Sequence, residues 1–332
     1  MTSAHKMQRA FSSRDRKLGM SWERTQLAEA KGKPQCEARL DRLEMMASEI
    51  DEPLILGIPG VRRGRNNFIR RKHPKQFLPY GRRTSYTTTG SIRQAVVLSE
   101  PSMPHIAPFK VTLIARDEVG LQRTDVLSIL ELLPDSRIVL VELAFDFGFR
   151  SGVDGAFVRR HALFGKSRPN QGGVYRCWDS WGSRRGAKYV RSYFKPKLGV
   201  HRVELELHRK FLRRNGIKDI FDFNRLVEIV PQRHILFAKL DKNIIVRHLK
   251  NAGHDRYEVR QILERVSEHD DDIYAQCAVL RKRGRLKNVR RALVPLHTNR
   301  LVRKAIKRWA AQWPKGPKRL EGRDESQTLE CD

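Results

Sequence analysis

The sequence predicts an α+β fold, with a mostly antiparallel central sheet, helices packed on it, and a basic α-helical region toward the C-terminal end. Residues 188–195 and 201–208 repeat their side-chain character with a period of two, which is typical of strands. Between residues 92 and 164, stretches of strand and helix periodicity follow one another, and after residue 215 the hydrophobic spacing is helical. This order is typical of a sheet with helices on one face.

Residues 1–52 are polar and mixed in charge, which predicts a mobile leader. Within this leader, apolar side chains recur at helical spacing from Leu40 to Ile50 and predict one short helix over residues 36–50.

Residues 53–90 predict a basic, loop-rich arm, because glycine and proline interrupt a run of arginine and lysine. The arm is either solvated or in contact with the DNA backbone. The aromatic residues interleaved in it are Phe68, Phe77, Tyr80 and Tyr86. Since aromatic rings stack on bases, they predict contact with single-stranded DNA.

Residues 91–215 are expected to form the core of the fold. The predicted strands are residues 92–98, 109–115, 137–147, 188–195 and 201–208, and the predicted helices are residues 124–133 and 155–164. Proline and glycine in residues 196–199 predict a hairpin between the last two strands, which makes them antiparallel.

This hairpin places reactive side chains on shared faces, because every second residue of a strand leaves the same face. The first strand presents Arg191, Tyr193 and Lys195 together. The second strand presents Arg202, Glu204, Glu206 and His208. A half-buried strand needs only polar side chains on its solvent face. These strands carry a phenol, carboxylates, an imidazole and guanidiniums there, which indicates a reactive site.

Three short motifs follow one another across the hairpin: Gly182-Ser183-Arg184, then Arg191-Ser192-Tyr193-Phe194-Lys195, then Arg202-Val203-Glu204-Leu205-Glu206. Together they resemble the replication initiation factor family, the rolling-circle replication initiators of plasmids, filamentous phages and integrative elements. An upstream strand of that family carries Asp-x-x-x-Asp, and Glu142 and Asp146 stand at the matching positions here. The resemblance covers about residues 137–215, and Phe194 stands where the family has Asp or Asn.

The resemblance implies an enzyme that nicks one DNA strand through a tyrosine and later rejoins it. Tyr193 would attack the scissile phosphate and form a 5′-phosphotyrosyl link, with Lys195 and Arg191 stabilising the developing charge. Tyr189, four residues earlier on the same face, is the alternative nucleophile. The other interpretation of Tyr193 is a packing residue whose hydroxyl bonds a neighbour.

Glu142 and Asp146 lie four residues apart on a predicted strand and therefore share a face. If that strand lies beside residues 201–208, four carboxylates converge, namely Asp146, Glu204, Glu206 and Glu142. Oxygen ligands suit Mg²⁺ or Mn²⁺, and the absence of Cys-x-x-Cys and His-x-His pairs argues against zinc. The alternative is that Glu204 pairs with an arginine across the strands and stabilises the sheet.

The balance of charge points to a polyanionic partner. The chain has 332 residues, with 67 Lys and Arg against 37 Asp and Glu, and a net charge of +30. Nucleic acid is the first candidate and an anionic membrane the second. No apolar run is long enough to span a bilayer, the N-terminus lacks a hydrophobic signal core, and the four cysteines are widely separated. A cytoplasmic location without membrane association is therefore expected.

Residues 216–320 are expected to form a helical, basic DNA-binding region, and residues 321–332 a disordered tail. Helices are predicted at residues 221–230, 235–250 and 256–268. Farther on, an apolar stripe from Leu301 to Trp313 predicts an amphipathic basic helix, which can lie on DNA, on a membrane or against its own domain. Contact with the DNA backbone is favoured. The DNA-binding candidates are Arg184, Arg202, Arg281, Arg283, Arg285, Lys287, Arg290 and Arg291.

The sequence therefore predicts a rolling-circle initiator that binds an origin, nicks one strand and recruits a host helicase and polymerase, with homodimerisation left open. Two alternatives remain. The first is a DNA-binding protein without nicking activity, either a decayed relative or a regulator, which Phe194 and Glu142 favour. The second is a basic RNA-binding or membrane-surface protein whose strand motifs are coincidental.

Overall fold

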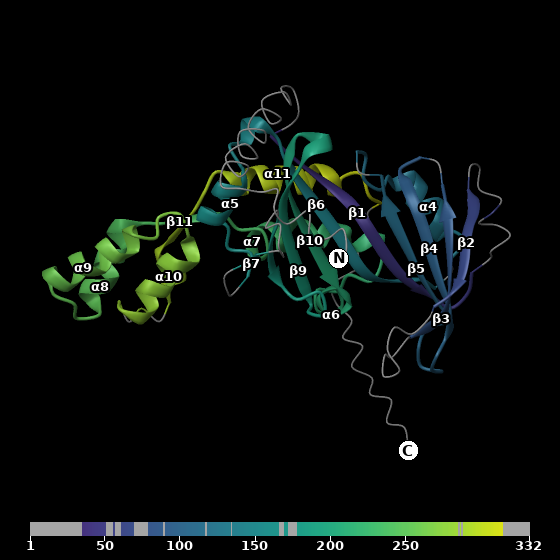
Figure 1. The fold of residues 1–332 in the computed structure, drawn as a ribbon, viewed down its shortest axis with the longest axis horizontal. Coiled ribbons are helices and arrows are strands. Elements are labelled where there is room, and N and C mark those ends of the chain that lie inside the picture. Colours follow the sequence, from purple (N-terminus) through teal and green to yellow (C-terminus); the bar gives the residue numbers. More distant parts are fainter. Residues whose placement is uncertain are drawn as a thin grey trace, which may run out of the picture.

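An antiparallel β-sheet forms the body of the molecule (Figure 1). The computed structural model describes residues 35–50, 56, 61–69, 79–88, 90–116, 118–133, 135–165, 169–171, 178–284, 286 and 288–314. Across the sheet, the strands of these residues follow in the order β2 (Arg62–Phe68), β3 (Tyr80–Thr87), β4 (Ile92–Pro101), β5 (Phe109–Ala115), β1 (Cys36–Ala47), β6 (Arg137–Phe147), β10 (Val200–His208), β9 (Lys188–Lys195), β8 (Trp178–Gly182) and β7 (Asn170–Gln171). Every neighbouring pair is antiparallel, which confirms the predicted α+β fold.

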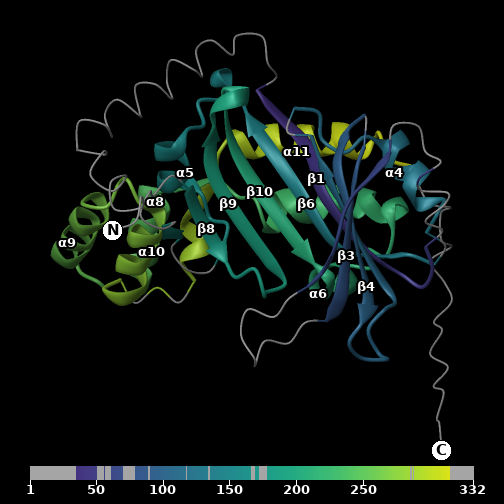
Figure 2. The same cartoon turned by 45° about the vertical axis from the view of Figure 1, so that its right-hand side comes forward.

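Helices pack on one face of this sheet, and α11 runs behind the strands in Figure 2. They are α4 (Arg123–Leu130), α5 (Gly155–His161), α6 (Arg209–Arg214), α7 (Leu226–Arg233) and α11 (Thr298–Ala310). Beneath them, apolar side chains of the strands such as Leu43, Phe145 and Leu205 are fully buried in one continuous core. Because successive residues of a strand alternate between faces, the opposite side of the central strands is left to polar residues. The sheet thus has one apolar face covered by helices and one charged face.

Most elements of the predicted core are confirmed. β5, β6 and β9 have the predicted bounds, and β4, β10, α4 and α5 differ from theirs by one to three residues at an end. The β9–β10 hairpin closes through the 3₁₀ turn η2 (Pro196–Leu198) and Gly199, whose φ of 59° lies in the left-handed region. Glycine adopts this conformation without the steric penalty that a Cβ brings, so the predicted Pro/Gly connection has a physical basis.

The helix predicted at residues 36–50 is wrong, because this segment contains strand β1. β1 lies between β5 and β6 near the middle of the sheet, so it is not part of a mobile leader, and residues 1–34 lie outside the described residues. The register on β6 shifts between Leu40 and Arg42, which marks a β-bulge. The bulge places Leu40 and Leu43 on the same buried face although they are three residues apart. A spacing of three residues between buried side chains is also typical of a helix, which explains the wrong prediction.

The arm predicted at residues 53–90 contains two strands, so the prediction of loop is wrong for them. β2 and β3 extend the sheet beyond β4. Tyr80 and Tyr86 are 3% and 2% exposed, which excludes the predicted stacking of these two rings on bases. Phe68 is 70% exposed, and Phe77 lies outside the described residues.

Residues 216–314 contribute both to the body and to a helical lobe. α11 packs on β1, and the turn η3 (Ile220–Arg225) and α7 pack against α11. The lobe, at the left of Figure 1, consists of α8 (Lys242–Asn251), α9 (Arg256–Ser267), α10 (Ile273–Lys282) and the turn η4 (Val289–Ala292). The helix predicted from residue 235 begins only at Lys242, because β11 (Ala238–Leu240) first pairs with β12 (Leu293–Pro295).

α11 lies against its own domain, one of the three alternatives that its amphipathic sequence allowed. Val302, Ile306 and Trp309 are buried, and α11 packs across β1. The rings of Trp309 and Trp313 lie 5.3 and 5.1 Å from the ring of Phe223. The basic residues of the helix are exposed, and Arg308 also donates to the carbonyl oxygen of Cys36 at 2.8 Å. Within the described ranges, no helix combines the length and the apolarity needed to cross a bilayer.

Candidate functional site

The candidate site lies on the charged face of the sheet, over β1, β6, β10 and β9. Antiparallel pairing sets residues of neighbouring strands opposite one another, and opposite residues share a face. This register brings together the residues predicted for catalysis and for metal binding, which are Glu142, Asp146, Arg191, Tyr193, Lys195, Glu204 and Glu206. β1 adds Arg39, Asp41 and Arg42, which were not predicted as site residues because their segment was expected to belong to a mobile leader. We call these ten residues and Arg202 the charged cluster.

Two arginines hold the three glutamates of the charged cluster together. Nη2 of Arg191 lies 2.6 Å from Oε2 of Glu204, 2.9 Å from Oε1 of Glu142 and 3.5 Å from Oε1 of Glu206. Nη2 of Arg42 lies 2.9 Å from Oε2 of Glu142 and 3.3 Å from Oε2 of Glu206. Carboxylates this close repel one another, and guanidiniums between them offset that repulsion.

Arg202 is fully buried between two aspartates. Its Nε and Nη2 donate to the two oxygens of Asp146 at 2.6 and 2.7 Å, and its Nη1 donates to Asp41. A bidentate pair of this kind is strong, and breaking it leaves a buried charge without a partner. In this structure Arg202 is buried and bound by acids, and its role as a DNA-binding residue stays a prediction.

Tyr193 is half-buried, and its hydroxyl donates a hydrogen bond to Oε1 of Glu204. Burial, followed by the charge and the hydrogen bond of Glu204, raises the pKa of Tyr193 well above its ordinary value of 10.0. The phenol therefore holds its proton at neutral pH, and Glu204 is placed to accept it. A phenol that reacts as a nucleophile needs such an acceptor.

Two acids of the charged cluster titrate close to neutral pH. Burial, followed by repulsion from Glu204, raises the pKa of Glu142 to about 7, although the neighbouring arginines lower it. Burial likewise raises the pKa of Asp41 to about 6, against the attraction of Arg202. Protonation of either acid changes the net charge of the cluster within the physiological range of pH.

Tyr189 and Lys195 lie on the same face as Tyr193. Tyr189 is 5% exposed, and the guanidinium of Arg184 lies 5.5 Å from its ring centroid. A buried ring capped by a cation is typical of a packing residue, so the geometry favours Tyr193 over Tyr189 as the nucleophile. Lys195 is half-buried, and its charge lowers the pKa of Asp41, which shows that it contributes to the field of the cluster.

The four carboxylates predicted to bind Mg²⁺ or Mn²⁺ are each engaged by a guanidinium. Arg202 takes both oxygens of Asp146, and Arg191 and Arg42 bridge the glutamates. In the part of the chain that the structure describes, no three His, Cys, Asp or Glu side chains are grouped so that they could hold a metal ion. A divalent cation needs several free oxygen ligands around one point, so this arrangement does not fit one. The metal stays a prediction.

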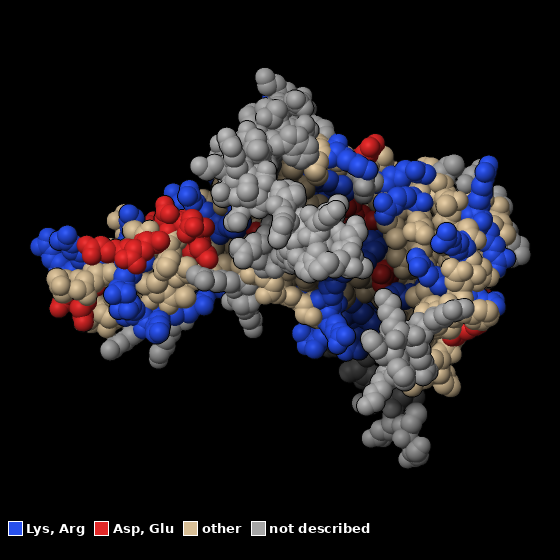
Figure 3. All heavy atoms as spheres, in the orientation of Figure 1, with Lys and Arg blue, Asp and Glu red and all other residues tan. Residues whose placement is uncertain are grey.

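Five of the other predicted DNA-binding residues are on the surface. Arg184 is exposed between β8 and β9. The exposed residues at the end of α10 and in η4 are Arg281, Arg283, Arg290 and Arg291. Arg285 and Lys287 lie outside the described residues. Figure 3 shows Lys and Arg spread over the body, whereas Asp and Glu gather on the helical lobe.

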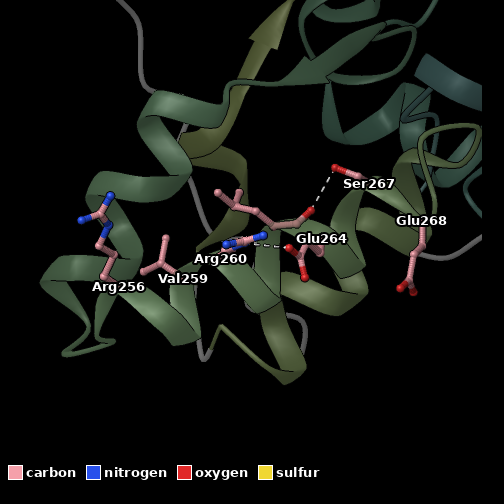
Figure 4. Close-up of a pocket in the computed structure, with 7 residues that line it drawn as sticks. Arg256, Val259, Arg260, Glu264, Ser267 and Glu268 are labelled. Carbon is pink, nitrogen blue, oxygen red and sulfur yellow. Dashed lines mark hydrogen bonds and ion pairs between the residues drawn. The ribbon is translucent and has the colours of Figure 1, made fainter.

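A shallow hollow of about 600 Å³ lies on α9 of the helical lobe, away from the charged cluster (Figure 4). Val259 and Leu263 contribute its apolar lining. Nε of Arg260 pairs with Oε1 of Glu264 at 3.0 Å, and the hydroxyl of Ser267 donates to the carbonyl oxygen of Leu263 at 3.0 Å. Because these polar groups bond within the helix itself, the hollow offers no reactive set, and the charged cluster remains the candidate site.

Comparison with known proteins gives a weak structural likeness. No family model matches the chain, and no curated protein matches its sequence. Its structure is similar to that of a rolling circle replication initiator protein from Geobacillus stearothermophilus, with a TM-score of 0.38 and 13% sequence identity, over 62% of this chain and 88% of that one. A likeness at this score carries no argument about function.

Proposed function

We propose that this protein initiates rolling-circle replication by nicking one DNA strand through Tyr193 and later rejoining it. The observation that carries the proposal is the hydrogen bond from Tyr193 to Glu204, a carboxylate that also binds Arg191 at 2.6 Å. This contact joins a nucleophile, a group that can take its proton and a cation that can contact a phosphate. The net charge of +30 supports a polyanionic substrate.

In the proposed nicking step, Oη of Tyr193 attacks the scissile phosphorus while Glu204 takes the hydroxyl proton. The bond from phosphorus to the 3′ oxygen breaks, and this oxygen takes a proton from water to become a 3′-hydroxyl. The 5′ phosphate stays on Tyr193 as a phosphodiester, so the strand can be rejoined without an external energy source. The free 3′-hydroxyl is available to a host polymerase, and a host helicase unwinds the duplex.

Arg191 is the group proposed to stabilise the charge that develops on the phosphate. In the free protein it is bound by Glu204 and Glu142. Because the pKa of Glu142 is about 7, this acid can take up a proton near neutral pH and weaken its hold on Arg191 when a phosphate arrives. Lys195 supplies a second positive charge on the same face.

Mg²⁺ or Mn²⁺ remains a prediction within this proposal. The steps above use no metal, because the predicted ligands Asp146, Glu142, Glu204 and Glu206 are bound by arginines in this structure. Comparing each metal with an excess of chelator in the nicking assay tests the requirement directly.

Covalent capture tests the proposed function. The protein is incubated with supercoiled plasmid and single-stranded DNA from its own genetic neighbourhood, then denatured to reveal a protein–DNA adduct. We expect the adduct in the wild type and in Tyr189→Phe, and none in Tyr193→Phe. An adduct lost only in Tyr189→Phe would assign the nucleophile to that residue instead. The absence of any adduct with all substrates and metals would overturn the nicking activity.

A DNA-binding protein without nicking activity is the second candidate function. Two observations favour it, namely the raised pKa of Tyr193, which keeps the phenol protonated, and Phe194 in place of the Asp or Asn of the similar family. Tight, salt-sensitive binding to DNA without any covalent adduct would support this candidate.

A further inference from the structure

We propose that the β2–β3 edge of the sheet is a separate binding site for the backbone of duplex DNA. The identity of the partner rests on the proposed function, but the residues belong neither to the charged cluster nor to the helical lobe. β2 is the outermost strand on its side of the sheet in the described part of the chain. All seven of its residues are exposed, whereas β1 alternates between buried and half-buried residues. β2 therefore presents both of its faces to solvent.

Three arginines of this edge have no acidic partner among the described residues. Arg62, Arg65 and Arg83 are exposed, and no carboxylate of the described residues forms an ion pair with them. In the charged cluster, by contrast, Arg42 and Arg202 are bound by acids. Guanidiniums without an internal partner keep their full charge for phosphate oxygens.

The strand pairing arranges these groups along one ribbon. Asn67 lies opposite Arg83, and Phe68 lies opposite Arg82. The guanidinium of Arg82 lies 5.2 Å from the ring centroid of Phe68 and also pairs with Glu100 at 3.0 Å. Arg82 is thus engaged with its neighbours and holds Phe68 in place, while Arg83 on the other face is open to a ligand.

Duplex DNA suits this edge better than a single strand. A single-strand platform uses several aromatic rings that stack on successive bases. Among the described residues of β2 and β3, Phe68 is the exposed ring, while Tyr80 and Tyr86 are buried. A duplex backbone needs no stacking, because arginines and the unpaired backbone N–H groups of an outer strand donate to its phosphates.

Charge on an edge strand also prevents strands of different molecules from pairing. Protection against such pairing does not require one sign, because acidic and basic side chains serve it equally. β2 and β3 carry basic side chains and no acid, with the sequences RRGRNNF and YGRRTSYT. Figure 3 likewise shows Lys and Arg at the right-hand end of the molecule, where Figure 1 draws β2. Charge of one sign selects for a polyanion.

The edge lies far from Tyr193. In the order of the sheet, β2 is seven positions from β9, since β3, β4, β5, β1, β6 and β10 lie between them. At about 4.8 Å between strands, this is roughly 34 Å along the sheet. The edge therefore meets a different part of the DNA from the phosphate that Tyr193 would attack.

The salt dependence of duplex binding tests this site. Every protein carries Tyr193→Phe, so that no nicking occurs during the measurement. The edge variant adds Arg62→Ala, Arg65→Ala and Arg83→Ala. The matched control adds three substitutions that remove the same charge from exposed positions of α6, namely Arg209→Ala, Arg213→Ala and Arg214→Ala. Circular dichroism and thermal unfolding establish that both variants remain folded, as expected for exposed side chains.

For a duplex of generic sequence, the logarithm of the binding constant falls linearly with the logarithm of salt concentration, by about 0.9 for each phosphate contact. We expect this slope to become shallower by about 2.7 in the edge variant and to stay unchanged in the control. An unchanged slope in the edge variant, or an equal change in the control, would overturn the proposed site. A loss confined to binding of single-stranded oligonucleotide would also overturn it.

The two proposals fail separately. If no covalent adduct forms with Tyr193 intact but the slope still falls in the edge variant, the edge site stands and the nicking function does not. If the adduct forms but the slope of the edge variant does not change, the nicking function stands and the edge site does not.

Discussion

The hydroxyl of Tyr193 donates a hydrogen bond to Glu204, although the register sets Tyr193 opposite Arg202 and Glu204 opposite Arg191. The contact is therefore diagonal across β9 and β10, within the reach of a long aromatic side chain. Through it, the carboxylate that could take the proton of the phenol is the same one that binds Arg191. Removing Glu204 should consequently affect both the nucleophile and the cation beside it.

Glu204→Gln keeps the shape of the side chain but cannot accept a proton. We expect the single-turnover rate of adduct formation to fall by about 10²–10⁴-fold at neutral pH. The residual rate should rise with pH throughout the accessible range, because the raised pKa of Tyr193 leaves little phenolate near neutrality. Glu44→Gln is the matched control, since Glu44 lies on the same face but binds Lys110 at 2.7 Å. A variant at Glu204 that kept the wild-type rate would exclude its role as proton acceptor.

Glu142 should make the stability of the protein depend on pH. Its pKa of about 7 in the folded state lies above the ordinary 4.5, so the folded state binds more protons between these values. The contribution of Glu142 to stability is thus fully present below pH 4.5 and is lost as pH rises to about 7. Across this window, the free energy of unfolding of the wild type should fall by up to about 3 kcal/mol relative to Glu142→Gln.

Denaturant unfolding at a series of pH values measures this difference. Asp41→Asn serves as the comparison, because the pKa of Asp41 is raised from 3.8 to about 6 and its window therefore ends at lower pH. Stability curves of wild type and Glu142→Gln that ran parallel from pH 4 to 8 would contradict the prediction.

Arg202→Met should destabilise the fold. The substitution leaves Asp146 buried without its bidentate partner, which costs about 3–5 kcal/mol. Adding Asp146→Asn should recover part of this loss, since the uncompensated charge is then removed. A double-mutant cycle from urea unfolding measures the coupling. A loss of stability below about 1 kcal/mol in Arg202→Met would show that the pair does not hold the sheet together.

α11 should act as a structural helix through its apolar face. Trp309 is buried and packs on Phe223 and Trp313, so Trp309→Ala should lower the free energy of unfolding by about 3–5 kcal/mol. Arg303 of the same helix is exposed, and Arg303→Ala should change stability by less than about 0.5 kcal/mol. Equal effects of the two substitutions on the denaturation midpoint would mean that α11 does not cover the sheet in solution.

The predictable strands were those whose own residues favour a strand, by alternation or by composition. β9 was predicted with its observed bounds because it alternates without a bulge. β6 was predicted with its observed bounds although its register on β1 shifts between Leu140 and Ile138, because β-branched and aromatic residues fill the strand.

β1 was mistaken for a helix because its bulge interrupts the alternation. The buried residues are even-numbered up to Leu40 and odd-numbered from Leu43. The alternation of Cys36 and Ala38 with charged residues was a usable signal for a strand, but it spans too few residues to outweigh the helical spacing that follows.

β2 could not be predicted for a different reason. Its sequence of arginine, glycine and asparagine has low strand propensity and no apolar face, so nothing local marks it as a strand. It is a strand because β3 supplies hydrogen-bonding partners along it. Gly64 allows this pairing at the bulge, since a Cβ there would lie 3.0 Å from Oγ of Ser85.

The sequence by itself determined which side chains within a strand share a face, because alternation is a local property of the extended backbone. Arg191 and Tyr193 were therefore placed together correctly before any strand pairing was known. The tertiary structure decided which strands are neighbours, and with them the ion pairs of the site. β1 inserts between β5 and β6, and only this insertion brings Arg42 to Glu142 and Asp41 to Arg202. Hydrogen bonds and packing between segments far apart in the chain select these neighbours, and no pattern within one segment encodes them.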